Sequence, residues 1–142
     1  MDTNPPAYAI FESKYRLLPA PYEVKMYDAS SLFAGKIHAV LCRAWKNRVK
    51  GRDLYDYVFY MARQTPVNRL HLRERLLQSG YIGENMECTM DDVKKMLLER
   101  FETIDYEQAK RDVEPFIRDT TSLALWKADF FKQITEMLVG IN

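Results

Sequence analysis

The pattern of hydrophobic and polar positions along the chain changes its period near residue 29. Before that point, Tyr22 to Tyr27 alternates strictly between apolar and polar side chains, which predicts a half-buried strand. Tyr8 to Leu18 is rich in β-branched and aromatic residues and predicts a second strand. Because only Pro19 to Pro21 separates the two stretches, we expect the strands to lie side by side.

After residue 29, apolar side chains recur every three or four residues, which is the spacing of helices with one buried face. Ser30 or Ser31 is a suitable N-cap for the first of these helices, and Ser122 opens the last. Two capping pairs and one stop glycine mark further boundaries: Thr89 with Asp92, Asp105 with Gln108, and Gly80.

These signals predict two strands followed by about six helices, which is an α+β fold that is mostly helical. Residues 1–28 would supply a short sheet and residues 29–142 a helical region of a single domain, long enough to bury one core. We expect both strands to pack against the first helix. The expected core consists of Phe33, Ile37, Val40, Leu41, Leu54, Val58, Met61, Leu72, Leu76, Leu97, Phe101, Phe130 and Ile134.

A sheet of two strands is only marginally stable by itself. Either the helices cover this sheet or another chain pairs with the backbone groups at its edge. We therefore expect self-association, or pairing with a partner fragment, through an exposed edge of one of the two predicted strands.

Composition excludes several broad classes of protein. The 21 Lys and Arg residues nearly cancel the 20 Asp and Glu residues, so the chain as a whole has no strong attraction to nucleic acid or to an anionic membrane. No apolar run is long enough to span a bilayer and no signal-peptide pattern is present, which predicts a cytoplasmic protein without membrane contact. Cys42 and Cys88 are not spaced as metal ligands, and Cys42 lies within an apolar helix as a small hydrophobic residue.

Recognisable chemistry is concentrated in the segment from Ser30 to Met61, which predicts two helices joined by a basic loop. Lys36 lies on or beside the apolar face of the first helix, and Asp53 and Asp56 share one side of the second. In a simple antiparallel hairpin Lys36 and Asp53 would be about 10 Å apart along the axis, so they meet only if the helices cross or a nucleotide spans the gap. Five cations surround the loop without an acidic residue among them: Arg43, Lys46, Arg48, Lys50 and Arg52.

Each of these features also has a purely structural interpretation. A lysine on an apolar helix face often lays its stem on the core, and an aspartate at a helix start is favoured by the helix dipole. The basic loop can be a solvated turn, although its cations beside Trp45 also suit phosphate or RNA. His38 and His71 have no partners at metal-ligand spacing and are interpreted as structural or surface residues. Three tyrosines distributed round the second helix are interpreted as packing residues: Tyr55, Tyr57 and Tyr60.

Four stretches between Asp2 and Tyr81 share the pattern of a known family: DTNPP, YRLLPAPYEVKMYD, SLFAGKIHAVLCRAWKNRVKGRDLYDY and FYMARQTPVNRLHLRERLLQSGY. Together they resemble the AbiEii/AbiGii-type nucleotidyltransferase toxins of abortive-infection and type IV toxin–antitoxin systems. These toxins are members of the polymerase-β-like nucleotidyltransferase superfamily. The patterns AGKIHAVL and KGRDLYD are fairly specific together and weak when taken separately.

The resemblance implies a phage-defence toxin that transfers a nucleoside monophosphate from a nucleoside triphosphate (NTP) to an RNA, such as tRNA, or to a protein. It implies Mg2+ and NTP as cofactors and an antitoxin protein as a partner. By the same resemblance Lys36 is the nucleotide-phosphate contact, Asp53 is an active-site carboxylate and Asp56 supports it. The basic residues that would help to hold the nucleotide are Arg43, Lys46, Arg48, Lys50 and Arg52.

One part of the family pattern is missing from this sequence. Enzymes of the family carry an earlier Gly-Ser or Gly-Gly turn followed by an Asp-x-Asp pair that holds divalent metal ions, and this chain contains neither. Asp2 matches a later family carboxylate next to the metal site, which makes it a candidate catalytic residue and metal ligand. We therefore interpret the chain as the C-terminal portion of such an enzyme. Two-metal phosphoryl transfer needs carboxylates that fix the ions, so we expect the isolated chain to be inactive.

Two other classes of function are compatible with parts of the sequence. A non-catalytic protein could hold nucleotide, RNA phosphate or a cognate antitoxin through the basic loop. A nuclease is suggested by Glu23-Val24-Lys25, which matches the E-x-K pattern of restriction-type sites. The nuclease is disfavoured because it needs an upstream metal-binding aspartate and only Asp2 is available.

Overall fold

Helices form most of the structure, a computed structural model that describes residues 11–15, 23–42 and 50–141, with backbone only for 11–15 and 23–27. Within these ranges the strands are β1 (Phe11–Tyr15), β2 (Glu23–Tyr27), β3 (Val67–Asn68) and β4 (Gly140–Ile141). The α-helices are α1 (Ala29–Cys42), α2 (Gly51–Ala62), α3 (Arg69–Gln78), α4 (Met90–Phe101), α5 (Tyr106–Val113) and α6 (Ala128–Thr135). Two 3₁₀ helices, η1 (Glu114–Phe116) and η2 (Thr120–Leu125), lie between α5 and α6. The predicted fold, α+β and mostly helical, is confirmed.

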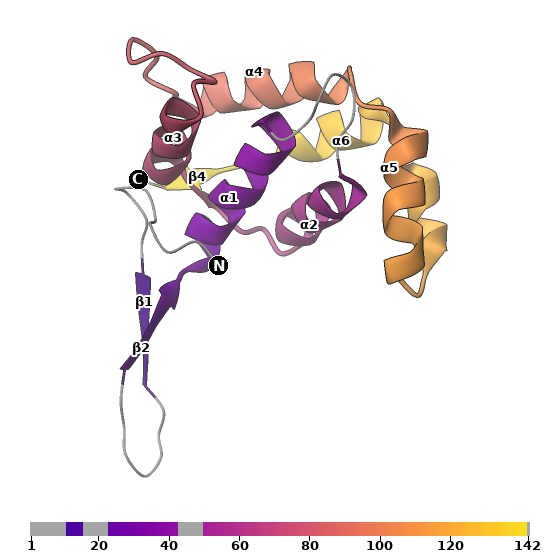
Figure 1. The fold of residues 1–142 in the computed structure, drawn as a ribbon, viewed down its shortest axis with the longest axis horizontal. Coiled ribbons are helices and arrows are strands. Elements are labelled where there is room, and N and C mark those ends of the chain that lie inside the picture. Colours follow the sequence, from indigo (N-terminus) through magenta and orange to yellow (C-terminus); the bar gives the residue numbers. More distant parts are fainter. Residues whose placement is uncertain (1–10, 16–22, 43–49, 142) are drawn as a thin grey trace.

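Helix α1 lies at the centre of the helical body and contacts α2, α3, α4 and β3 (Figure 1). Its inward face consists of Phe33, Ile37 and Val40, which are completely buried at the spacing predicted from the sequence. Full burial of each such side chain stabilises the fold by about 1.5–3 kcal/mol. At the end of the helix the Val40 carbonyl accepts a hydrogen bond from Arg100 Nε of α4 at 3.1 Å. The helix that carries Lys36 is therefore enclosed by three others.

Strands β1 and β2 pair in an antiparallel hairpin, with Phe11 opposite Tyr27 and Tyr15 opposite Glu23. The pairing predicted from the sequence is confirmed. In Figure 1 the hairpin continues from the start of α1 away from the other helices, rather than lying along α1 as expected. The faces of α1 are already occupied by other helices, which accounts for the difference.

A second, parallel pair of strands was not predicted. Strands β3 and β4 pair with Val67 opposite Gly140, and the Val67 N–H donates to the Val139 carbonyl at 2.9 Å. Each strand has two residues, too few to give a periodic signal in the sequence. This pair ties the connection between α2 and α3 to the last residues that the structure describes.

Several helix boundaries follow the predicted capping residues. The Thr89 side chain accepts from the Asp92 N–H and the Asp92 carboxylate accepts from the Thr89 N–H, so the capping box of α4 is confirmed. The Asp105 carboxylate accepts from the Gln108 N–H at the start of α5. After α3, Gly80 has a φ of 77°, a left-handed conformation that glycine adopts without strain.

The cap of α1 differs from the prediction. Asp28, rather than Ser30 or Ser31, provides it: its carboxylate accepts from the Ser31 N–H at 2.8 Å and from the Ser30 hydroxyl at 2.9 Å. A charged acceptor at a helix start gains from both the hydrogen bond and the helix dipole. Ser31 is buried instead, and its hydroxyl accepts from Asn68 Nδ2 at 3.1 Å. Asn68 also caps α3, so one side chain joins the starts of two helices.

The prediction of one continuous last helix from Ser122 is wrong. The chain forms η2, capped by Asp119, and only then α6, which begins at Ala128. Between them Trp126 has an extended backbone (φ −71°, ψ 95°) and is buried. Because the two residues before α6 are extended, the side chains of α6 point in other directions than they would in one helix continuous with η2.

This change of phase alters the core. Most of the predicted core residues are buried: Phe33, Ile37, Val40, Leu41, Leu54, Leu72, Leu76, Leu97 and Phe101. Val58, Met61 and Ile134 are only partly buried against this core. On α6 the fully buried ring belongs to Phe131, and the neighbouring Phe130 is partly buried. The Phe131 ring contacts five other aromatic rings at centroid distances between 5.1 and 6.5 Å: Tyr57, Phe101, Tyr106, Trp126 and Phe130.

Tyr57 joins α2 to α6 through a buried hydrogen bond. Its hydroxyl lies 2.7 Å from Thr135 Oγ1, and the Thr135 hydroxyl donates to the Phe131 carbonyl at 2.7 Å, so Tyr57 is the donor to Thr135. Burial raises the pKa of the Tyr57 phenol above its ordinary value of 10. The packing role predicted for this tyrosine agrees with its complete burial.

We expect Tyr57→Phe to reduce the free energy of unfolding at neutral pH by about 1 kcal/mol, the value of one hydrogen bond. The folded protein keeps a proton on Tyr57 that the unfolded chain releases above pH 10, so wild-type stability should fall as pH rises beyond that value. The variant should show a smaller fall, although not none, because burial also raises the pKa of Tyr106 and Tyr81. Urea unfolding at neutral and alkaline pH measures both effects. Tyr55→Phe, on the exposed side of the same helix, should change neither.

Candidate functional site

Lys36 and Asp56 form an ion pair between α1 and α2, with 2.8 Å between Lys36 Nζ and Asp56 Oδ2. The side chains are 39% and 37% exposed, so the pair lies at the solvent-facing side of the helix contact. Partly exposed pairs contribute up to about 1 kcal/mol. The carboxylate therefore holds the ammonium group in place but can be replaced by another anion, such as a phosphate oxygen.

Asp53 lies one turn before Asp56 on α2 and has different surroundings. It is buried, with 4% of its surface exposed, in the first turn of the helix, where a negative charge is favoured by the helix dipole. From the sequence, these two acids were predicted only to share one side of the helix. The structure instead separates them into a buried carboxylate and a surface carboxylate that contacts Lys36.

The first turn of α2 rests directly on α5. Gly51 is buried, and a Cβ atom at this position would lie 2.0 Å from the Ala109 carbonyl oxygen. Only glycine allows so close an approach between the two backbones. The position of Asp53 and Asp56 therefore depends on the absence of a side chain at residue 51.

Two of the predicted cations lie at this end of α2. Lys50 is the N-cap residue and Arg52 is exposed in the first turn, with its guanidinium carbon 5.2 Å from the centre of the Phe116 ring. Together with Asp112 they line an open hollow of about 360 Å³. Cations beside a helix N-terminus favour the binding of an anion, whereas the negative charge of Asp112 disfavours it.

Four of the predicted site residues lie outside the described residues: Asp2, Arg43, Lys46 and Arg48. Their roles stay predictions from the sequence. Of the predicted cations, the structure describes Lys36, which pairs with Asp56, and Lys50 and Arg52 at the start of α2.

The described residues do not form a two-metal site. Within the described ranges no group of three or more His, Cys, Asp or Glu side chains is placed to hold a metal ion. Asp56 already faces a cation, and Asp53 is buried in the first turn of its helix. His71 is buried as well, and its Nε2 accepts from Arg75 Nε at 3.2 Å, which agrees with a structural role. Two Mg2+ ions would need several oxygen ligands that these side chains do not supply.

An aromatic stack that was not predicted from the sequence joins α1 and α2. The Phe59 ring is exposed and lies perpendicular to the Tyr60 ring, which in turn stacks on the buried Phe33 with 5.1 Å between the ring centres. The guanidinium carbon of Arg63 lies 4.3 Å from the centre of the Phe59 ring. Phe59 follows Asp56 by three residues and so lies on the same side of α2, a spacing that could have indicated it.

Comparison with known proteins identifies the class to which this fold and these residues belong. A family described as "Nucleotidyl transferase AbiEii toxin, Type IV TA system" matches residues 2–134. No curated protein and no solved structure matches the chain. The chain belongs to the AbiEii family of nucleotidyl transferase toxins, as the sequence resemblance predicted. None of the helices in the described ranges has the length and hydrophobicity needed to cross a membrane.

Proposed function

We propose that this chain binds the phosphates of an NTP at the contact between α1 and α2, as part of a cytoplasmic phage-defence toxin. The observation that carries the proposal is the ion pair between Lys36 and Asp56. It keeps a lysine at a fixed but accessible position, and Lys50 and Arg52 add positive charge at the start of α2. A phosphate oxygen can take the place of the Asp56 carboxylate.

The toxin would transfer a nucleoside monophosphate to a hydroxyl group of RNA, such as tRNA, or of protein. The acceptor oxygen forms a bond to the α-phosphorus, and the bond to the leaving pyrophosphate breaks. The hydroxyl proton passes to a carboxylate, for which Asp53 is the candidate. Phe59 offers a ring face on which the base can stack.

Binding and transfer place different demands on the chain. Positive charge is enough to hold a triphosphate, but transfer also requires carboxylates that fix Mg2+. The sequence has no Asp-x-Asp pair, and the described residues have no cluster of carboxylates that could replace it. We therefore expect the chain on its own to bind NTP and to show no measurable transfer.

Lys36→Ala should weaken the binding of ATP and GTP by about 10–100-fold, because a hydrogen bond to a charged group contributes about 1.5–3 kcal/mol. Wild-type affinity should also fall as salt concentration rises, since salt screens the attraction between exposed charges. Calorimetric titrations of both proteins at two salt concentrations measure these effects. Lys95→Ala, at an exposed lysine of α4, is the matched control and should bind as the wild type does.

Asp56→Asn removes the anion that competes with phosphate for Lys36, so it should strengthen binding by up to about fivefold. Asp53→Ala should change affinity less than Lys36→Ala does, or strengthen it. Equal affinity in Lys36→Ala and the wild type, or an equal loss in Lys95→Ala, would show that the phosphates bind elsewhere.

Transfer is tested with labelled NTP, Mg2+, bulk tRNA and protein. Incorporation that disappears in Asp53→Ala would show that this chain is a complete enzyme. Binding without incorporation supports the second candidate function, a non-catalytic protein that holds nucleotide, RNA or the antitoxin. The missing carboxylate cluster favours this second candidate for the chain alone.

A further inference from the structure

One stripe of accessible side chains runs along α2 from its first turn to its C-cap. Arg52, Asp56, Phe59 and Arg63 follow one another at intervals of four, three and four residues, which places them on the same side of the helix. All four are at least partly exposed, which agrees with this placement. Each residue adds about 1.5 Å, so Arg52 and Phe59 are about 10 Å apart along the axis. A ligand that lies along the helix can therefore contact different groups of the stripe with its two ends.

Two groups that suit parts of a nucleotide are each covered by a neighbouring side chain. Lys36 contacts the Asp56 carboxylate at 2.8 Å, and the guanidinium carbon of Arg63 lies 4.3 Å from the centre of the Phe59 ring. Both contacts join accessible groups and are therefore weak enough for a ligand to replace. A phosphate oxygen can replace the carboxylate. A nucleobase can take the place of the guanidinium on the ring, because flat bases and guanidinium groups both stack on aromatic rings.

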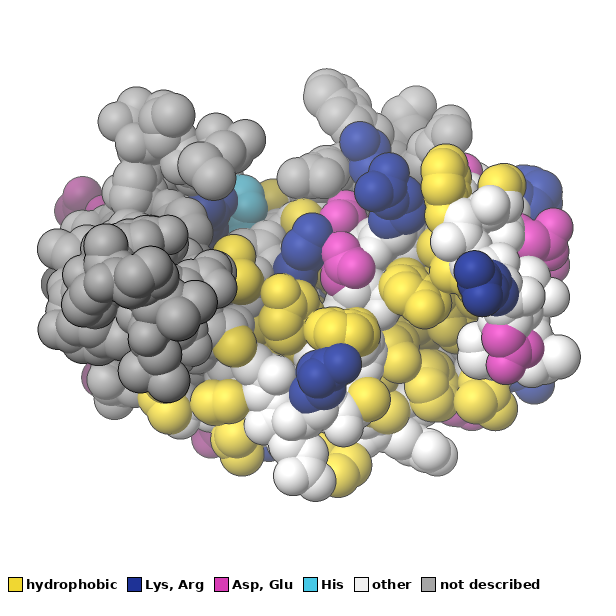
Figure 2. All heavy atoms as spheres, turned by 90° about the horizontal axis from the view of Figure 1, so that it is seen from below, with side chains coloured by type: hydrophobic (Ala, Val, Ile, Leu, Met, Phe, Trp, Pro, Cys, Tyr) yellow, Lys and Arg dark blue, Asp and Glu magenta, His cyan; other side chains and the backbone are white. Residues whose placement is uncertain are grey.

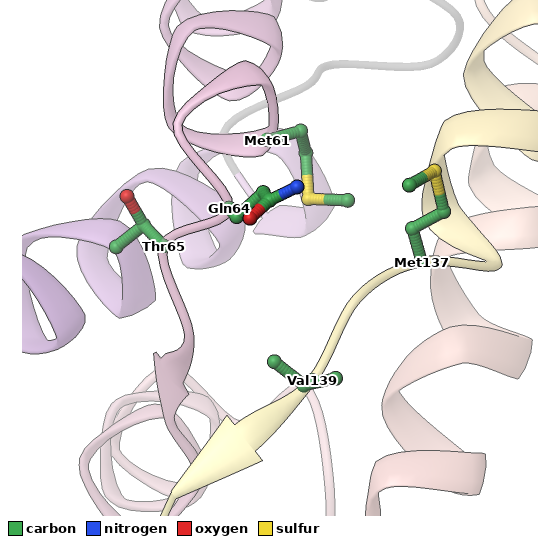
Figure 3. A pocket seen from close by; sticks show the side chains of 5 residues that line it. All are labelled: Met61, Gln64, Thr65, Met137 and Val139. Atoms are coloured by element: carbon green, nitrogen blue, oxygen red, sulfur yellow. The ribbon is translucent and has the colours of Figure 1, made fainter.

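The hollows at the two ends of α2 differ in charge. The hollow at the start is lined by two cations, Lys50 and Arg52, together with Asp112. At the other end lies a hollow of about 290 Å³ whose described lining residues are all uncharged (Figure 3): Met61, Gln64, Thr65, Met137 and Val139. A groove between α2 and α6 adjoins it, and its described lining residues are uncharged as well.

This difference in charge sets the direction of a ligand that has one anionic end. The helix dipole adds to it, since the start of α2 is its positive end and the last turn its negative end. A triphosphate is therefore favoured at the start of the helix and disfavoured near Arg63, where only one cation faces the dipole. Figure 2 shows Lys and Arg side chains lying among hydrophobic side chains on one face of the molecule. A mixture of this kind suits a ligand with phosphates and a flat ring.

We propose that the nucleotide lies along α2 with its triphosphate towards Arg52 and its base between the Phe59 ring and the Arg63 guanidinium. The α-phosphate then contacts Lys36, whose partner Asp56 lies between the two ends of the stripe. Arg63 moves off the ring and covers the base from the other side. This inference rests on the proposed nucleotide site and adds to it the orientation of the ligand and a second base-binding residue.

Ligands that lack one end of the nucleotide test this orientation. Phe59→Leu removes the ring but keeps an apolar side chain, so it should weaken the binding of ATP and AMP by about fivefold or more and leave tripolyphosphate, which has no base, unchanged. Arg52→Ala should weaken ATP and tripolyphosphate by about two- to fivefold and leave AMP unchanged. Tyr81→Leu, at an equally exposed ring, and Lys95→Ala, at an exposed charge, are the matched controls and should bind all three ligands as the wild type does.

Arg63→Lys separates stacking from charge at the other end of the stripe. Lysine keeps the positive charge but has no flat group that stacks on a base. The variant should therefore bind ATP about two- to fivefold more weakly and tripolyphosphate as the wild type does. Weaker binding of tripolyphosphate would show that Arg63 contacts phosphate instead, and would overturn the orientation.

The orientation and the phosphate site can fail separately. If Lys36→Ala weakens ATP binding but Phe59→Leu and Arg52→Ala each act equally on all three ligands, or act on the opposite ends, the orientation is wrong and the phosphate site stands. If Lys36→Ala binds ATP as the wild type does, the phosphate site is wrong and the orientation falls with it. Circular dichroism checks that each variant is folded, which we expect because Arg52, Phe59 and Arg63 are exposed.

Discussion

Phe131→Ala should destabilise the protein by about 3–5 kcal/mol, the largest effect that we expect from any single substitution. The ring is completely buried and contacts aromatic side chains from α2, α4, α5 and α6. Its removal leaves a cavity that rigid rings cannot fill by small movements. The free energy of unfolding in urea measures the loss.

Phe130→Ala is the matched control for the phase of α6. Phe130 is only partly buried and lines the groove between α2 and α6, so its removal should cost clearly less than that of Phe131. The sequence alone predicts the opposite order, with Phe130 in the core. A larger loss for Phe130→Ala would therefore favour a helix that continues from Ser122 without a break.

Gly51→Ala should destabilise the protein by about 1–3 kcal/mol, although alanine is the better helix former. The added methyl group would lie 2.0 Å from the Ala109 carbonyl oxygen and 3.0 Å from its carbon, and both are backbone atoms that cannot rotate away. Relief requires α2 to move from α5, which also displaces Asp56 from Lys36. We therefore expect unfolding at lower urea concentration together with altered NTP affinity.

Gly83→Ala separates this clash from a general effect of removing glycine. A Cβ atom at Gly83 would have nothing within 4 Å, so this variant should be as stable as the wild type or slightly more so. Equal stability of Gly51→Ala and Gly83→Ala would show that α2 and α5 do not approach as closely as described.

The parts of the fold that depend on neighbouring residues could be predicted from the sequence. The starts of α4 and α5 follow from side chains that bond to backbone groups three residues away. The break at Trp126 could not be predicted, because Leu125, Phe130 and Ile134 also fit one continuous helix. Two extended residues reset the phase of α6, and only packing against the rest of the core decides in favour of that break.

The residues of the candidate site were identified from the sequence, but their pairing was not. The spacing of Lys36 and Asp53 in a simple helical hairpin predicts a gap between them along the axis. Lys36 lies six residues before the end of α1 (42 − 36) and Asp56 five after the start of α2 (56 − 51), so these two are nearly equidistant from the connection. Which acid reaches the lysine depends on how the two helices pack, and the spacing of residues along the chain does not determine that packing.

The hydrogen bonds at the two ends of α1 determine how the protein can unfold. Asn68 holds the start of the helix and Arg100 its last turn, and these residues come from different parts of the chain. A partly melted form that releases α3 or α4 would also release the helix that positions Lys36. Heat or a protease that opens the helical body should therefore separate Lys36 from Asp56 in the same step as unfolding, without a loosened intermediate that keeps this ion pair.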